Sequence, residues 1–262
     1  MADNTDQKVK STDSTRNTFD YSKTDLVIYH GGCPDGVAGA WCFWTLLNKN
    51  ESKFHAGKFK ETPPDVTGKH VVFVDFSYSE EIIKDMLSKA ASVRILDHHK
   101  SALPLVNITA DNYSTVIDIS RSGAHIAWDE LYGDDSGQGL LRPWFIKDIG
   151  DRDLWAWKQV GSVDTCMAMY TLKYYESFTA FDTIRHIPRE YFVMVGNALN
   201  EKNKKTIDNT VARAVDCIAT SLIDPTKTWK VRVVECDHDI ASEVGNKLVL
   251  DGLCDFSIMF RY

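Results

Sequence analysis

The sequence predicts an α/β fold in which helices cover a parallel β-sheet, followed by a small C-terminal α+β unit. Apolar runs of strand length alternate with segments of helical periodicity, which is the pattern of parallel βαβ units. Three of these runs end directly in acidic or histidine side chains. The carboxyl ends of parallel strands meet at one edge, where open α/β sheets bind ligands, so this edge is the predicted site.

The predicted strands with polar ends are short and mostly apolar. In chain order they occupy residues 26–29, 71–74 and 93–96. Their polar ends, in the same order, are His30 with Asp35, then Asp75, then Asp97-His98-His99. If the strands belong to one parallel sheet, these side chains converge.

Three helices are predicted between and after these strands. Residues 37–48 are apolar all round and predict a buried helix that begins just after Gly36. Ser77 and Glu80 have the spacing of a capping box before an amphipathic helix. Residues 122–132 predict a further helix, which Gly133 ends and a polar loop over 134–139 follows.

A dense acidic segment occupies residues 145–155. It places three carboxylates and one arginine between apolar residues, which is too much charge for a simple turn. We therefore treat it as a further candidate contributor to the site.

The chain divides by composition into four parts. Residues 1–23 are polar and predict a disordered leader, and residues 24–188 form the main domain. Residues 189–226 have a helical pattern and predict a linker. Residues 227–262 predict a short β-α-β unit, which is below the size that usually folds alone.

Composition excludes several classes of protein. Hydrophobic residues make up 44% and charged residues 26%, as in an ordinary globular chain, and no apolar stretch approaches the roughly 20 residues that span a bilayer. The six cysteines contain no C-x-x-C pair, so we expect no zinc knuckle or disulfide framework and a cytoplasmic location. The net charge of −7 argues against binding to long duplex nucleic acid.

Four segments within about residues 25–160 resemble the motifs of the DHH phosphoesterase superfamily. They are His30-Gly-Gly-Cys-Pro-Asp35-Gly, Val-Asp75-Phe, Asp97-His98-His99 and Gly150-Asp151-Arg152-Asp153-Leu154-Trp155. A fifth segment, Asp118-Ile-Ser-Arg121-Ser122-Gly123-Ala124, is typical of a compact branch that includes nano-RNases and exopolyphosphatase-like proteins. The resemblance implies that residues 24–188 are a DHH-type metal-binding catalytic domain.

This resemblance implies a centre with two metal ions. Two ions about 3.5–4 Å apart neutralise charge on phosphoryl oxygens and supply hydroxide at neutral pH. The metal ligands implied are His30, Asp35, Asp75, His98 and Asp151. Asp75 would bridge the ions, Asp35, His98 and Asp151 would complete one of them, and His30 would help to hold the other. Oxygen ligands with added imidazoles favour Mn²⁺, with Mg²⁺ or Co²⁺ as alternatives.

Other residues of the motifs have supporting roles by the same resemblance. Asp97 would orient the imidazole of His98, and His99 would face the substrate phosphate, so that the catalytic residues are Asp75, His98 and His99. Asp153 is an alternative ligand to Asp151, or else a partner of Arg152 or a cap. Arg121, Ser122 and Gly123 precede a predicted helix, where a phosphate contact and a plain N-cap by Ser122 are both open.

The sequence departs from the superfamily at two places. Cys33 stands where many members have an aspartate, and it is either a further metal ligand or a buried structural thiol. The C-terminal substrate-binding domain of this branch usually contains a Gly-Gly-Gly-His turn, which this sequence lacks, so the C-terminal unit resembles a shortened form of that domain.

We therefore expect a manganese-dependent phosphohydrolase that acts on small phosphate esters or short single-stranded oligonucleotides, without a membrane partner and in a chain that could form a homodimer. The departures leave open a nucleotide-binding or scaffold protein with reduced catalysis. Because a metal cluster alone does not distinguish esters from anhydrides, a pyrophosphatase-like activity is the third possibility.

Overall fold

The computed structural model describes residues 19–133 and 140–261 and confirms the predicted fold class. The chain consists of two compact units, residues 1–196 and 197–262. Most of the predicted leader and the predicted loop over 134–139 lie outside the described residues. Within the described ranges, no helix is both long and apolar enough to cross a bilayer.

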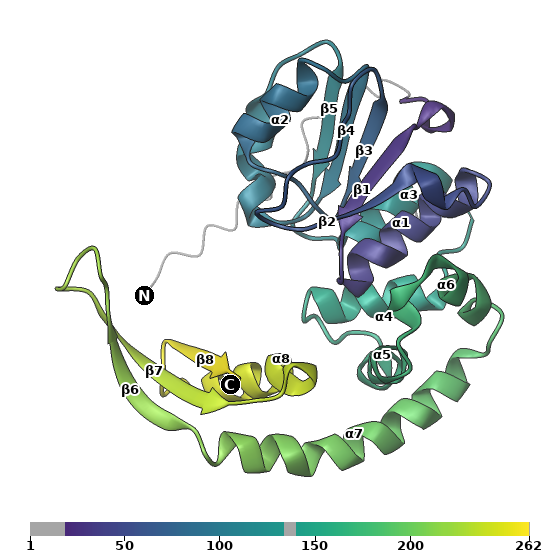
Figure 1. The fold of residues 1–262 in the computed structure, drawn as a ribbon. Coiled ribbons are helices and arrows are strands. Elements are labelled where there is room, and N and C mark those ends of the chain that lie inside the picture. Colours follow the sequence, from purple (N-terminus) through teal and green to yellow (C-terminus); the bar gives the residue numbers. More distant parts are fainter. Residues whose placement is uncertain (1–18, 134–139, 262) are drawn as a thin grey trace. The chain divides into compact units, whose positions relative to one another are not determined.

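The first unit contains a five-stranded parallel sheet (Figure 1). Its strands are β1 (Leu26–His30), β2 (Phe54–Gly57), β3 (His70–Val74), β4 (Ser92–Asp97) and β5 (Tyr113–Ile117). They lie in the order β2-β1-β3-β4-β5, and every neighbouring pair is parallel. The chain leaves β1 toward β2 and returns to β3 on the other side of β1. This reversal of strand order is where doubly wound sheets form a ligand-binding crevice.

Helices cover both faces of this sheet (Figure 1). The helices of the first unit are α1 (Pro34–Leu46), α2 (Glu80–Leu87), α3 (Gly123–Tyr132), α4 (Trp144–Asp153), α5 (Ser162–Thr171) and α6 (Phe178–Ile184). The 3₁₀ segments are Tyr21–Lys23, Glu51–Lys53, Lys100–Asn107 and Tyr174–Glu176. The helix α7 (Arg189–Val211) continues from the first unit into the second.

The alternation of side chains along the strands produces two hydrophobic cores. Val27 and Val72 belong to the core under α1, α3 and α4, whereas their neighbours Ile28 and Phe73 belong to the core under α2. Successive strand residues point to opposite faces, so a sheet covered on both sides needs continuous apolar runs. This is why β1, β3 and β4 were recognisable in the sequence.

The second unit is a three-stranded sheet with one helix. It comprises β6 (Val215–Thr220), β7 (Thr228–Glu235), the 3₁₀ segment His238–Ile240, α8 (Ala241–Val249) and β8 (Phe256–Phe260). The strand β7 pairs antiparallel with β6 and parallel with β8. The predicted β-α-β arrangement of residues 227–262 is present, but the sheet also includes β6, whose residues the sequence predicts to be part of a helical linker.

The element boundaries differ from the sequence predictions at three further points. The first helix begins at Pro34 rather than after Gly36, because proline suits the first helical position. Ser79, not Ser77, precedes α2, and the hydroxyl of Ser77 donates instead to Asp97 over 2.9 Å. Residues 19–23 were predicted to be disordered, but the ring of Tyr21 packs 5.4 Å from that of Phe43.

Candidate metal centre

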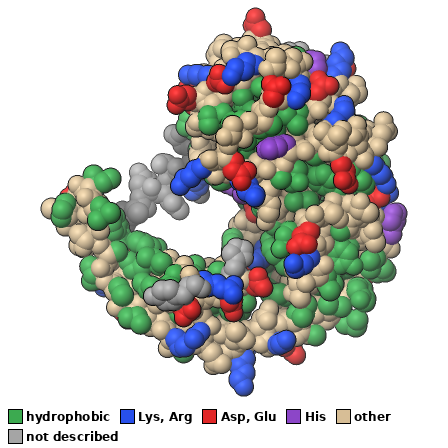
Figure 2. Space-filling model, viewed as in Figure 1, with side chains coloured by type: hydrophobic (Ala, Val, Ile, Leu, Met, Phe, Trp, Pro, Cys, Tyr) green, Lys and Arg blue, Asp and Glu red, His purple; other side chains and the backbone are tan. Residues whose placement is uncertain are grey.

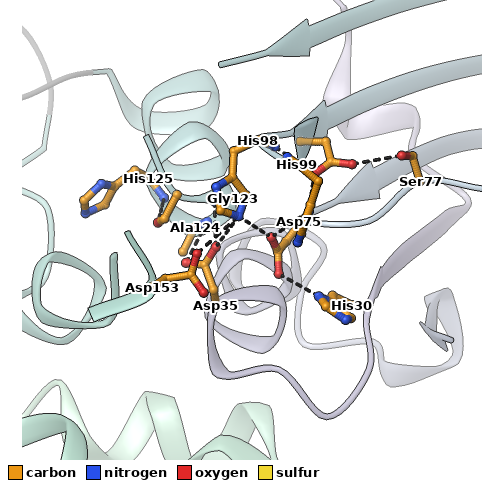
Figure 3. Close-up of polar contacts among 12 residues, drawn as sticks. His30, Asp35, Asp75, Ser77, His98, His99, Gly123, Ala124, His125 and Asp153 are labelled. Carbon is orange, nitrogen blue, oxygen red and sulfur yellow. Dashed lines mark hydrogen bonds and ion pairs between the residues drawn. The ribbon is translucent and has the colours of Figure 1, made fainter. Parts of the chain in front are cut away.

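The polar residues at the strand ends converge as the sequence predicted (Figure 3). His30 is the last residue of β1, Asp75 directly follows β3, and His98 and His99 directly follow β4. Asp35 lies in the first turn of α1 and is buried. Because these elements are parallel neighbours at the switch point, side chains separated by up to 69 positions in sequence meet there.

Asp75 is the centre of this cluster. Its carboxylate is buried, with Oδ2 3.3 Å from Nδ1 of His30 and Oδ1 3.1 Å from Nε2 of His98. Among the described residues neither oxygen has a hydrogen-bond donor of proper geometry. Burial acts to raise the pKa of Asp75, but the two imidazoles outweigh it and lower that pKa to about 2. Asp75 is therefore an ionised, buried carboxylate whose two oxygens each lie beside one imidazole.

Two sets of three side chains are close enough to hold a metal ion each. The first comprises Asp35, Asp75 and His98, and the second comprises His30, Asp75 and His99. Within each set the ligand atoms lie within 4.8 Å of one another. Both sets use Asp75, so one carboxylate serves two positions. Carboxylate oxygens without donors and imidazole nitrogens are suitable ligands for divalent cations such as Mn²⁺.

Asp35 connects the first set to the start of α3. Its carboxylate accepts hydrogen bonds from the backbone N–H groups of Gly123, over 2.6 Å, and Ala124, over 3.3 Å. Burial and the nearby charge of Asp75 raise the pKa of Asp35 well above its usual value, despite this support from the helix N-terminus. Three acids, Asp35, Asp75 and Asp153, thus lie close together in a site that a cation would stabilise.

Asp97 supports the cluster without joining either set. It accepts from the backbone N–H groups of His98 and His99 over 2.7 and 3.1 Å, and from the hydroxyl of Ser77. Its Oδ1 also lies 2.7 Å from Nδ1 of His99. The predicted supporting role is present, but the imidazole that Asp97 orients is that of His99 rather than that of His98.

The structure differs from the sequence prediction at the acid of the fourth motif. The carboxylate of Asp151 accepts from the backbone N–H groups of Lys158 and Gln159 and from the hydroxyl of Ser162, so it is fully engaged outside the cluster. Asp153, ranked second by sequence, lies with Oδ2 3.2 Å from Nε2 of His98. Asp153 is therefore the acid that α4 brings to the site.

The predicted phosphate contacts at the start of α3 are also engaged elsewhere. The guanidinium of Arg121 pairs with Asp118 over 2.7 Å and with Asp129 over 2.8 Å. The hydroxyl of Ser122 accepts from the N–H of His125, which is the plain N-cap alternative. The N–H of Gly123 donates to Asp35. Arg121, Ser122 and Gly123 therefore hydrogen-bond to other groups of the chain and are not directed at a bound phosphate.

Cys33 precedes α1 and belongs to neither set of three. Burial and the neighbouring acids Asp75 and Asp35 raise the pKa of its thiol well above the usual value. Because neither set includes Cys33, its position fits the structural alternative better than the ligand alternative.

His99, which the sequence predicted to face the substrate, lies beside His30 and Asp75 as a candidate third ligand, and this role was not predicted. The available signal was its position two residues after Asp97 at a strand end, where the carboxylate of Asp97 can orient the imidazole toward the cluster.

No protein-family model matches the chain. It is similar to Uncharacterized protein R106 of Acanthamoeba polyphaga mimivirus, with 27% identity over 173 residues. The match covers 60% of this chain and 39% of the viral protein, so the chain spans about two fifths of the length of the curated relative it matches.

Proposed function

We propose that this chain is a metal-dependent phosphohydrolase of the DHH type that holds two divalent cations, preferably Mn²⁺. The observation that supports this best is the pair of three-residue sets that share Asp75. A shared carboxylate is the arrangement needed to keep two cations within a few ångströms of each other. The motif resemblance described above points to the same chemistry.

Different residues of the cluster would bind each of the two metal ions. Asp35 and His98 would hold one cation and His30 and His99 the other, and the carboxylate of Asp75 would contribute to both positions. Asp153 is near enough to His98 to join the first set. When bound, the cations would neutralise phosphoryl oxygens and lower the pKa of a water molecule, which makes it a nucleophile at neutral pH. Asp97 keeps Nδ1 of His99 occupied and so fixes the orientation of that imidazole.

The substrates proposed are small phosphate esters or short single-stranded oligonucleotides. Lys and Arg side chains are interspersed with Asp and Glu on the face of the first unit that Figure 2 shows. Such a mixed surface gives long duplex nucleic acid no continuous basic track. We also propose a cytoplasmic location, because the pattern of the six cysteines predicts no disulfide framework.

A nucleotide-binding protein with reduced catalysis is the second candidate. The observation in its favour is that Arg121 and Gly123, the groups predicted to contact phosphate, are bound to carboxylates of the chain itself. Under this alternative the site would bind a nucleotide and a metal without turnover.

The two candidates differ in a direct assay. The full chain is stripped of metal with a chelator, reloaded with Mn²⁺ and offered pyrophosphate, a nucleoside bisphosphate, a cyclic dinucleotide and a short RNA. We expect Mn²⁺-dependent release of phosphate or mononucleotide from at least one of them. Binding of Mn²⁺ and nucleotide without release from any of the four would favour the second candidate.

Variants connect that activity to the cluster. Asp75→Asn and His98→Ala should each lower kcat by roughly 10³-fold, because bound cations supply several kcal/mol of transition-state stabilisation. Asp85→Asn is the matched control, since Asp85 is an exposed acid on α2. Full activity in both cluster variants would contradict the proposal.

A further inference from the structure

The candidate metal centre is a row of side chains with two distinct ends. Successive contacts join His30 to Asp75 over 3.3 Å, Asp75 to His98 over 3.1 Å, and His98 to Asp153 over 3.2 Å. In Figure 3, His30 and Asp153 lie on opposite sides of Asp75. A phosphate bound at the middle of this row would have one substituent directed toward each end.

An exposed aromatic ring lies at the His30 end. The ring centroid of Phe59 is 5.9 Å from that of His30 and 5.0 Å from that of Phe76, and Phe59 is nevertheless 57% exposed. A turn closed by a 3.3 Å hydrogen bond from the N–H of Glu61 to the carbonyl of Lys58 presents this ring. Phe59 therefore offers an open apolar face beside a candidate metal ligand.

Two exposed indoles lie at the Asp153 end. Trp155 and Trp157 are 39% and 37% exposed, and their rings meet edge to face at 5.2 Å. Trp155 is two residues beyond Asp153, so the chain limits the distance between their Cα atoms to about 7 Å. Trp41 and Trp44, in contrast, are buried in the core.

The backbone of this second aromatic position is held in an unusual conformation. Trp155 and Trp157 both have φ of 50°, a left-handed conformation that bulky residues rarely adopt. Asp151 holds the segment in place, because its carbonyl accepts from the N–H of Ala156 and its carboxylate from those of Lys158 and Gln159. Strained backbone of this kind gathers at ligand-binding positions. Hydrogen bonds thus hold the backbone of the segment that carries both indoles.

We propose that Phe59 and the Trp155/Trp157 pair are two nucleobase-stacking positions, and that the ligand of this site is a phosphodiester joining two nucleosides. Aromatic side chains stack on any base, whatever its sequence, because every base has a π-face. A phosphomonoester would use one end of the row, whereas a diester uses both. The inference depends on the proposed function only for the location of the phosphate, since stacking requires no turnover.

A binding experiment with a non-hydrolysable probe tests this. The Mn²⁺-loaded full chain is titrated with two adenosines joined by a methylenephosphonate linkage, and with the same linkage between two riboses that carry no base. We expect the diadenosine compound to bind at least 25-fold more tightly, since each stacked base contributes about 5-fold or more.

Single variants assign the bases to the two positions. Phe59→Ala and Trp155→Ala should each weaken binding of the diadenosine probe by about 5- to 150-fold, and the two losses should multiply in the double variant. Binding of the base-free probe and of Mn²⁺ should stay unchanged in all three. Phe59→Tyr and Trp155→Phe should restore most of the affinity, and Tyr191→Ala, which removes an exposed ring on α7, is the matched control.

Two outcomes would overturn the inference. One is equal affinity for the two probes, and the other is an equal loss for both probes in the alanine variants, which would indicate a general effect on the site. The failure of the proposed function is separate from these. A chain that binds the diadenosine probe through both positions but releases no mononucleotide from a short RNA would retain the inference and lose the hydrolase.

Discussion

The N–H of Gly123 donates a 2.6 Å hydrogen bond to Oδ2 of Asp35, 88 positions earlier in the chain. The start of α3 is thereby held against the start of α1 at the edge of the sheet. The same glycine packs on Asp75, and a Cβ atom at position 123 would lie 2.4 Å from the Cβ of Asp75. Gly123 is thus a spacing residue between two acids of the candidate metal centre.

Gly123→Ala should therefore damage both stability and metal binding. The overlap with Asp75 should lower the free energy of unfolding by about 1–3 kcal/mol, measured by urea denaturation without metal, and should also weaken Mn²⁺ binding. Gly68→Ala is the control for backbone strain without a steric clash, because Gly68, unlike Gly123, has a positive φ of 69° and a Cβ added to it would meet no atom within 4 Å. It should lose stability through backbone strain alone and keep its Mn²⁺ affinity. Unaltered Mn²⁺ binding in Gly123→Ala would show that the edge of the sheet can relax.

The shared position of Asp75 makes the stoichiometry of metal binding informative. Calorimetric titration of the wild-type chain with Mn²⁺ should give two ions, and His99→Ala and His98→Ala should each give one. Asp75→Asn should bind neither ion. Backbone strain would not explain this loss, because asparagine tolerates the left-handed conformation of residue 75, where φ is 56°. Two ions bound by Asp75→Asn would mean that the two sets are not joined by that carboxylate.

The acids of α4 should separate in the same titration. Asp153→Asn should weaken Mn²⁺ binding by about 10- to 100-fold, the range found when a group beside metal ligands is removed. Asp151→Asn should leave Mn²⁺ binding intact and loosen residues 156–159, which faster amide hydrogen exchange at Lys158 and Gln159 would report. The reverse pattern would restore Asp151 as the ligand.

Metal affinity should rise with pH because of His98. Burial acts to lower the pKa of His98, but Asp75, Asp35 and Asp153 outweigh it and raise that pKa to about 9 in the metal-free chain. A ligating imidazole must be neutral, so Mn²⁺ displaces a proton and its affinity should increase about tenfold per pH unit between pH 7 and 9. Calorimetry in buffers of different ionisation enthalpy would count the proton, and a flat profile would contradict its release.

The stability of the metal-free chain should change in the opposite direction. The folded-state pKa of His98 lies above its unfolded value of about 6.5. Protonated His98 therefore stabilises the fold fully below pH 6.5, and this contribution is lost as the pH rises through about 9. Denaturation of the wild type and of His98→Gln at pH 6 and 9 would isolate the effect.

An ion pair between the buried Arg94 and the partly buried Glu130 should affect stability without affecting metal binding. Arg94 on β4 donates to Glu130 over 2.6 Å, and the hydroxyl of Tyr21 donates to the same carboxylate over 2.7 Å. Glu130→Ala should cost about 3 kcal/mol, because it leaves the guanidinium buried without its partner. The double variant Arg94→Met with Glu130→Leu should regain much of that loss in urea denaturation, with Mn²⁺ binding unaffected throughout.

The sequence predicted the elements whose side chains are buried on both faces. The strands β1, β3 and β4 are continuous apolar runs, and the ends of these strands could be recognised by their acids and histidines. The strands β2 and β5 have mostly half-exposed residues and no such run, so they were missed. The strand β6 is largely exposed and follows a long helix, and its residues were therefore included in the helical pattern.

The candidate ligands His30, Asp75 and His98 were predictable because the ends of the parallel strands position them. Asp35 was predicted from its motif, whereas His99 was expected to face the substrate phosphate and not to be a ligand. The choice between Asp151 and Asp153 depends on how α4 is rotated about its axis, and that rotation is set by the packing of Phe145 and Ile149 in the core. Likewise, only the folded chain shows that Arg121 is already paired with two acids.

The two acids of α4 also limit how this segment can change in evolution. Consecutive residues of an α-helix are about 100° apart around its axis, so Asp151 and Asp153 point about 200° apart. Asp151 anchors a loop and Asp153 approaches the candidate metal centre, and neither can take over the other's role by a single substitution. The deletion or insertion of one residue in α4 would misdirect both at once. An alignment of distant sequences that is shifted by two positions in α4 would therefore align Asp151 with Asp153, two residues with unrelated roles.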